Sequence, residues 1–149
     1  MEEDEHGDPA AVAEANARRK ATAIAGELVL GADTVVALDG DILGKPRDAA
    51  QAREYVGRLN GRTHEVVGGI ALARGGEVVA TAVEVTRVTF RASDDATLDW
   101  YVGTGEWEGR AGGYAIQGQG RRLVERIDGD YLNVVGLPLE RLKELLATG

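Results

Sequence analysis

Residues 28–38 read LVLGADTVVAL, and this stretch decides the fold. It opens with a short apolar run bounded by glycine and aspartate, which is typical of a buried strand. The chain continues in extended form after Asp33, and Asp39-Gly40 follows. An Asp-Gly pair flanked by apolar residues predicts a hairpin, with a return strand through 42–43. Asp33 is then expected at the end of the first strand segment, the edge at which α/β sheets usually bind ligands.

Helices are predicted on both sides of this stretch. Asp8-Pro9 combines an N-cap residue with proline at the first helical position, so a helix is expected over residues 10–25. After the hairpin, Gly44-Lys45-Pro46 interrupts the return strand. Asp48 followed by Gln51 then forms the capping-box pattern of a second helix.

The second half of the chain predicts more strands. Two long strands are expected over about 64–74 and 77–90, joined at Gly75-Gly76, and a change of phase between Val85 and Val88 indicates a bulge. A short helix capped by Ser93, a glycine-rich stretch at 109–120, a strand near 123–124 and a closing helix complete the order. Helices and antiparallel strands are mixed, which indicates an α/β or α+β sheet with helical cover.

Composition narrows the class of protein. A chain of 149 residues fits a single domain, 1–149. No apolar run approaches the roughly 20 residues of a membrane span, and the acidic start MEEDE is unlike a signal peptide, so a cytoplasmic location is expected. The absence of cysteine excludes disulfides and thiolate metal sites. A net charge of −8 disfavours nucleic acid and anionic membranes as partners.

The three lysines draw attention because arginine supplies the other 14 of the 17 basic side chains. A lysine is a compact point charge that suits a single phosphate oxygen. Lys20 shares a helical stripe with alanines near the packed face, where it either snorkels or meets an anion. Lys45 is presented between glycine and proline, with a solvated loop lysine as the alternative. Lys143 is interpreted as a surface residue of the terminal helix.

Asp33 is the best candidate carboxylate. Metal-assisted phosphoryl chemistry needs a carboxylate that deprotonates water, oxygen ligands for Mg²⁺ and cations that offset phosphate charge. A turn or capping role is the alternative for Asp33, and turn chemistry is the preferred interpretation of Asp39 and Asp41. We interpret Glu106 as a solvated acid rather than a ligand, and His64 as structural.

The glycine-rich stretch allows backbone to approach a ligand closely. It contains neither the spacing of a dinucleotide fingerprint nor that of a phosphate-binding P-loop. Gln117 within it could read a base edge or hold a phosphate.

Four segments, in order and at matching spacing, together resemble the Maf family of nucleoside triphosphate pyrophosphatases: GADTVV at 31–36, GKP at 44–46, AGGYAIQG at 111–118 and NVVGLP at 133–138. The resemblance implies an α/β, Maf/inosine-triphosphatase-like fold with a mixed sheet, flanking helices and a cleft between two lobes. It implies cleavage between the α- and β-phosphates with Mg²⁺ or Mn²⁺, a homodimer, and a link to septum formation.

The resemblance also implies roles for individual residues. Asp33 would be the proton acceptor and a metal ligand, and Lys20 and Lys45 would contact phosphate. Members that prefer dTTP and UTP carry the equivalents of Thr34 and Gln117, which also suits modified pyrimidine nucleotides. The metal ligand before the first helix would be Glu3.

Family members begin with a strand and a loop reading roughly Ser-x-Ser-Pro-Arg-Arg, and this chain lacks that segment. We therefore expect the first strand to be missing and one sheet edge to be open, through a start codon assigned too far downstream. Two alternatives stay open: a non-catalytic nucleotide-binding or cell-division regulatory protein, and a purine-directed pyrophosphatase of the same fold.

Overall fold

The computed structural model describes residues 7–23 and 28–148. In this part of the chain five strands form one sheet in the order β2-β1-β3-β4-β5. The strands are β1 (Val29–Leu38), β2 (Asp41–Leu43), β3 (Thr63–Arg74), β4 (Glu77–Phe90) and β5 (Val124–Asp128). The predicted α/β class with flanking helices is confirmed. All pairings between the described strands are antiparallel, so this sheet is antiparallel where a mixed sheet was expected.

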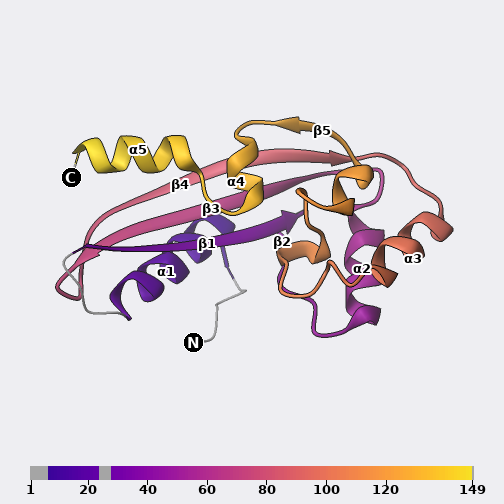
Figure 1. Ribbon diagram of the computed structural model, residues 1–149, viewed down its shortest axis with the longest axis horizontal. Helices are drawn as coiled ribbons and strands as arrows, with labels where there is room; N and C mark the ends of the chain where they lie inside the picture. The colour runs from indigo at the N-terminus through magenta and orange to yellow at the C-terminus, as the bar shows by residue number, and fades with distance from the viewer. Residues whose placement is uncertain (1–6, 24–27, 149) are drawn as a thin grey trace.

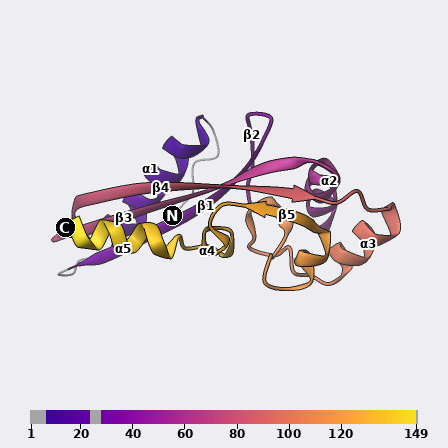
Figure 2. The same cartoon turned by 90° about the horizontal axis from the view of Figure 1, so that it is seen from above.

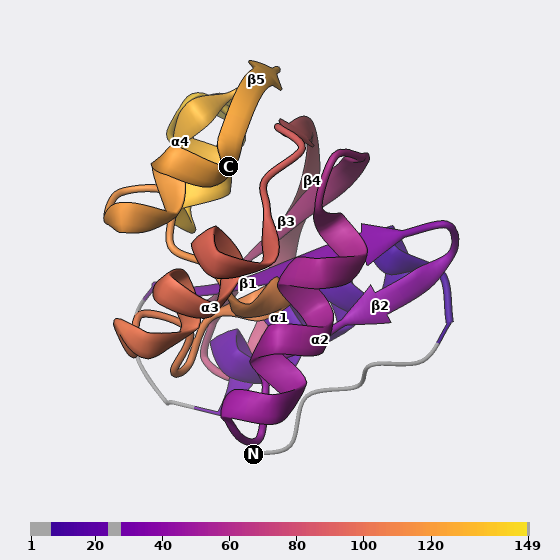
Figure 3. The ribbon, with the colours of Figure 1, turned by 90° about the vertical axis from the view of Figure 1, so that its right-hand side faces the viewer.

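Helices cover both faces of the sheet (Figures 1 and 2). Helix α1 (Pro9–Thr22) lies on one face, and α4 (Tyr131–Val135) and α5 (Leu139–Thr148) lie on the other. At one end of the sheet, α2 (Ala49–Leu59) packs against α3 (Asp95–Gly103), close to the short 3-10 turns η1 (Ala111–Gly113) and η2 (Gln119–Leu123) (Figure 3). None of the helices in 7–23 and 28–148 has the length and apolar character needed to cross a membrane.

Local signals in the sequence placed the starts of α1 and α2 and the hairpin correctly, whereas the expected cap of α3 was wrong by one residue, since Asp94 and not Ser93 accepts the capping hydrogen bond. The Asp8 carboxylate accepts a hydrogen bond from the Ala11 N–H at 3.1 Å, and Asp48 accepts one from the Gln51 N–H at 2.8 Å. Gln51 accepts from the Arg47 N–H, one residue before the expected partner. The hairpin turn has φ of 51° at Asp39 and 85° at the glycine after it, as a type I′ turn requires.

The predicted bulge between Val85 and Val88 was wrong. The register of β4 against β3 is regular there, and its shift lies at Val79, opposite residues 72–73. A second shift separates Thr89-Phe90 in the pairing with β5. Val85 is 43% exposed, so the phase change in the sequence reflects an uncovered position on one face rather than an inserted residue.

Helix α1 lies very close to the sheet because its alanines face strand glycines. Ala13 and Ala17 are fully buried. A Cβ at Gly31 of β1 would lie 2.5 Å from the Ala21 nitrogen, and a Cβ at Gly69 of β3 would lie 2.5 Å from the Ala13 carbonyl carbon. Such distances are too short for real contacts, so only glycine at both positions lets the helix pack at this depth.

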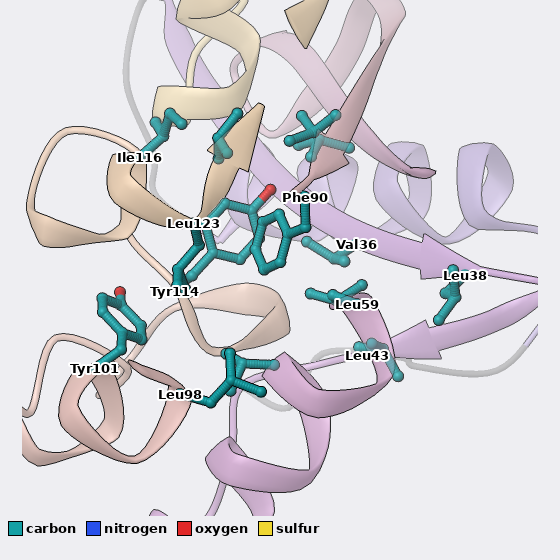
Figure 4. Packing of buried hydrophobic residues seen from close by; sticks show 14 residues of the cluster. Val36, Leu38, Leu43, Leu59, Phe90, Leu98, Tyr101, Tyr114, Ile116 and Leu123 are labelled. Carbon is teal, nitrogen blue, oxygen red and sulfur yellow. The ribbon is translucent and has the colours of Figure 1, made fainter. Parts of the chain in front are cut away.

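The largest hydrophobic cluster fills the opposite face, between the sheet and α2, α3 and the glycine-rich segment (Figure 4). Its aromatic centre joins distant parts of the chain. The rings of Phe90 and Tyr114 meet edge to face with centroids 4.8 Å apart, and His64 meets Phe90 at 5.2 Å. Tyr114 thus anchors the glycine-rich segment to the sheet.

Candidate active site

Asp33 lies inside β1, paired opposite Gly69 of β3, and not at a strand end. The predicted position at the tip of a strand was wrong, because β1 runs unbroken from Val29 to Leu38. The side chain points to the face that α1 covers, since side chains alternate along a strand and Gly31 on the same face contacts that helix.

Two side chains of α1 hold the Asp33 carboxylate. Lys20 donates from Nζ to Oδ1 at 3.1 Å, and Asn16 donates from Nδ2 to Oδ2 at 3.0 Å. Asp33 is only 5% exposed, and Asn16 is buried as well. Arg19 donates in turn to Oδ1 of Asn16, which fixes the amide orientation. A cation and a buried amide donor together stabilise a negatively charged carboxylate.

A pocket of about 240 Å³ opens beside this pair. It collects residues from both faces of the sheet. Lys20 and Asp33 reach it from the α1 face, whereas Thr34 and Val36 reach it from the opposite face of β1. Residues 32–34 of β1 line it, and no described strand pairs with them on the side opposite β3.

The structure brings the predicted substrate-binding residues together. Lys20, Thr34, Lys45 and Gln117 all line this pocket with Asp33. The segments that carry them are tied together, since the N–H of Gly112 donates to the carbonyl oxygen of Gly44 at 3.0 Å. These five residues therefore lie around one pocket, and their roles in binding and catalysis are proposed below.

Two lining features were missed by sequence reasoning. Arg110 adds a third cation to the pocket, and it forms no ion pair with any residue in the described part of the chain. Residues 134–136 form another part of the wall, next to Asn133 of α4. Fully buried Asn133 donates from Nδ2 to the carbonyl oxygens of Val66 and Glu84, at 3.0 and 3.1 Å.

The other candidate residues have structural partners. Asp39 and Asp41 pair with arginines beside the hairpin, as turn residues would. His64 is buried, in line with its structural interpretation, and its Nε2 lies 2.6 Å from the hydroxyl of Tyr114. Glu106 is partly buried and accepts hydrogen bonds from backbone, so its interpretation as a solvated acid was wrong.

The described residues do not by themselves make a metal site. Within 7–23 and 28–148, no group of three histidine, cysteine, aspartate or glutamate side chains could hold an ion. Asp33 is the acidic residue lining the pocket, and its oxygens contact Lys20 and Asn16. Glu3, the second predicted ligand, lies outside the described residues.

The chain is similar to known proteins over most of its length. Residues 1–149 match the family described as Maf-like protein. The chain is 45% identical over 138 residues to a dTTP/UTP pyrophosphatase of Pyrococcus furiosus, covering 93% of this chain and 72% of that protein. A dTTP/UTP pyrophosphatase of Symbiobacterium thermophilum is 48% identical over 153 residues, covering 97% and 78%. One of Thermus thermophilus is 49% identical over 138 residues, covering 93% and 73%.

Proposed function

This chain belongs to the Maf-like protein family, and from that premise we propose that it hydrolyses dTTP and UTP to the nucleoside monophosphate and pyrophosphate. Relatives at 45% to 49% identity carry the name dTTP/UTP pyrophosphatase, which supports this substrate class. The observation that carries the proposal is the buried Asp33–Lys20 contact of 3.1 Å in a pocket shared with Lys45 and Gln117.

Asp33 is proposed as the proton acceptor. As water attacks, the anhydride bond between the α- and β-phosphates breaks, the water oxygen stays on one product, and its proton passes to the Asp33 carboxylate. The contact with Lys20 suits this role because it keeps the carboxylate charged and oriented. A positioned base of this kind contributes about 10²–10⁴-fold to a rate.

The basic side chains are proposed to hold the phosphates. The whole chain carries a charge of −8, so a polyanionic substrate needs locally concentrated positive charge. Lys20, Lys45 and Arg110 supply it, because all three line the same pocket. Lys20 is 35% exposed at its side chain, which leaves part of it accessible while it contacts Asp33.

Thr34 and Gln117 are proposed to contact the nucleoside part. A glutamine amide offers both a donor and an acceptor, which suits the edge of uracil or thymine. The lining also includes apolar side chains, among them Ile116 and Val135, beside the ring of Tyr114. A pocket lined by both polar and apolar groups suits a nucleotide, whose phosphates are charged and whose base has apolar faces.

A divalent cation, Mg²⁺ or Mn²⁺, is also part of the proposal, since hard cations bind phosphate and carboxylate oxygens together. Asp33 is the carboxylate among the described lining residues that would contact it. A cytoplasmic location and a homodimer remain predictions from the sequence.

The test is pyrophosphate release from dTTP and UTP with Mg²⁺ or Mn²⁺, with GTP and ATP for comparison. We expect Asp33→Asn to lower kcat by about 10²–10⁴-fold while nucleotide binding persists. Asp128→Asn is the matched control, because Asp128 is a strand carboxylate paired with arginine at an exposed position.

Each outcome has a separate meaning. Undiminished turnover in Asp33→Asn would refute the role of that carboxylate. Nucleotide binding without pyrophosphate release by the unaltered protein would favour the regulatory alternative. Faster turnover of GTP or ATP than of UTP would favour the purine-directed one.

A further inference from the structure

Glu106 holds the backbone that follows Gln117. It lies in the turn after α3, where its Oε2 accepts a hydrogen bond from the Gln119 N–H at 2.8 Å. Its Oε1 accepts from the Gly120 N–H at 3.2 Å. Each carboxylate oxygen therefore takes one backbone donor, an arrangement stronger than a contact between neutral groups.

Gly118 allows this arrangement. A Cβ at Gly118 would lie 2.7 Å from both Cδ and Oε1 of Glu106. Its φ of −102° is not in the left-handed region, and the constraint that the structure shows at this position is the close approach of the carboxylate. The carboxylate thus occupies the space in which a side chain would stand.

The segment is also held before Gln117. The Tyr101 hydroxyl of α3 accepts a hydrogen bond from the Ala115 N–H at 2.8 Å, and the Ala115 carbonyl accepts from the Gly118 N–H at 3.2 Å. Tyr101 is fully buried, so the packing around its ring restricts the position of its hydroxyl. Gln117 is therefore carried on a short span fastened at both ends by residues of 101–106.

We propose that Glu106 is a positioning residue for Gln117 and thereby sets the preference for uracil and thymine over cytosine. The inference rests on the proposed function, in which Gln117 contacts the base. Uracil and thymine carry an acceptor oxygen at position 4, whereas cytosine carries a donor amino group there. A glutamine amide carries both a donor and an acceptor, and the place at which it meets the base depends on the position of the backbone that carries it.

Glu106→Gln is the main test, because the side chain keeps its shape. An amide has one acceptor oxygen, and its NH₂ group cannot accept from a backbone N–H. One of the two contacts to Gln119 and Gly120 is lost. We expect the ratio of kcat/KM for UTP over CTP to fall about 10-fold, within the range that pocket contacts supply.

Glu108→Gln is the matched control. It makes the same charge change in the same turn, and the Glu108 side chain forms no hydrogen bond or ion pair with a described residue. Its UTP/CTP ratio should equal that of the unaltered protein. Gly118→Ala disrupts the same contact by changing the other residue, because its Cβ displaces the Glu106 carboxylate. It should lower the UTP/CTP ratio of kcat/KM as Glu106→Gln does.

Amide hydrogen exchange gives a readout that is independent of catalysis. The Gln119 and Gly120 amides should exchange slowly in the unaltered protein and at least about 10-fold faster in Glu106→Gln, with the amides of β3 unchanged. If the unaltered protein releases no pyrophosphate, the proposed function fails. The exchange rates then still test whether Glu106 holds the Gln119 and Gly120 amides. A folded Glu106→Gln or Gly118→Ala variant with an unchanged UTP/CTP ratio, or with unchanged exchange at these two amides, overturns the inference.

Discussion

Replacing Gly31 with alanine should separate Lys20 from Asp33 without altering either side chain. Gly31 lies two residues before Asp33 in β1, on the face that α1 covers. The added Cβ would lie 2.5 Å from the Ala21 nitrogen and closer still to the Ala17 oxygen. Both are backbone atoms, so no side-chain rotation relieves the overlap. To reach an ordinary contact, α1 must move away by about 1 Å.

The size of the effect follows from where Lys20 sits. It lies on α1 between the two residues that the new Cβ meets, so it moves with the helix. Its 3.1 Å contact with Asp33 lengthens beyond hydrogen-bond range. Overpacking costs about 1–3 kcal/mol, or roughly 3–10 °C in Tm for a domain of this size. A misplacement of about 1 Å can cost 10²-fold in rate, so we expect kcat/KM for UTP to fall about 100-fold.

The assay combines pyrophosphate release with thermal unfolding. Gly103→Ala is the matched control, because nothing lies within 4 Å of a Cβ built there and its φ is not positive. That variant should keep its kcat/KM and gain at most about 1 kcal/mol. A Gly31→Ala protein with unchanged kcat/KM would refute the argument that the close packing of α1 positions Lys20. An unchanged Tm as well would refute the overpacking itself.

Two further outcomes are expected. Burial lowers the pKa of His64 from 6.5 to about 4. The unfolded chain therefore binds the extra proton, and stability falls as the pH drops from about 6.5 to about 4, by up to about 3 kcal/mol. Urea unfolding at pH 7 and pH 4.5 should show a smaller loss in His64→Gln, and equal losses would contradict this assignment. Arg110→Ala should raise KM for UTP about tenfold or more with little change in kcat, because a charge-assisted contact made throughout the reaction is lost. Arg121→Ala, another exposed arginine near the end of the same segment, is its control, and equal KM values in the two variants would remove Arg110 from the site.

Features determined by neighbouring residues could be predicted from the sequence. The N-caps Asp8 and Asp48 and the turn at Asp39-Gly40 each depend on hydrogen bonds or dihedral angles within a few residues. The grouping of Lys20 with Asp33 was also expected, through the family resemblance. The position of Asp33 inside a continuous strand was not, because the polar residue within GADTVV looks like a strand end when its tertiary partners on α1 are unknown.

Glu106 shows why part of the site escaped prediction. Its partners are backbone N–H groups 13 and 14 residues further along the chain. Every non-proline residue carries such a donor, so the sequence does not indicate which two N–H groups bind the carboxylate. The sequence did contain one signal, Gly118, whose missing side chain makes room for the carboxylate. Because the segment holds many glycines, this one does not indicate which residue packs against it.

A pair of glycines lets one strand, β3, shape both sides of the pocket. Gly68 and Gly69 are adjacent in β3, so their missing side chains leave space on opposite faces of the sheet. A Cβ at Gly69 would meet the backbone of α1, and one at Gly68 would lie 3.1 Å from Cγ of Asn133 in α4. Helix α1 brings Lys20 to the pocket, and α4 brings the wall beyond Asn133. Two walls of the proposed substrate site therefore depend on a pair of glycines in β3 that do not themselves line it.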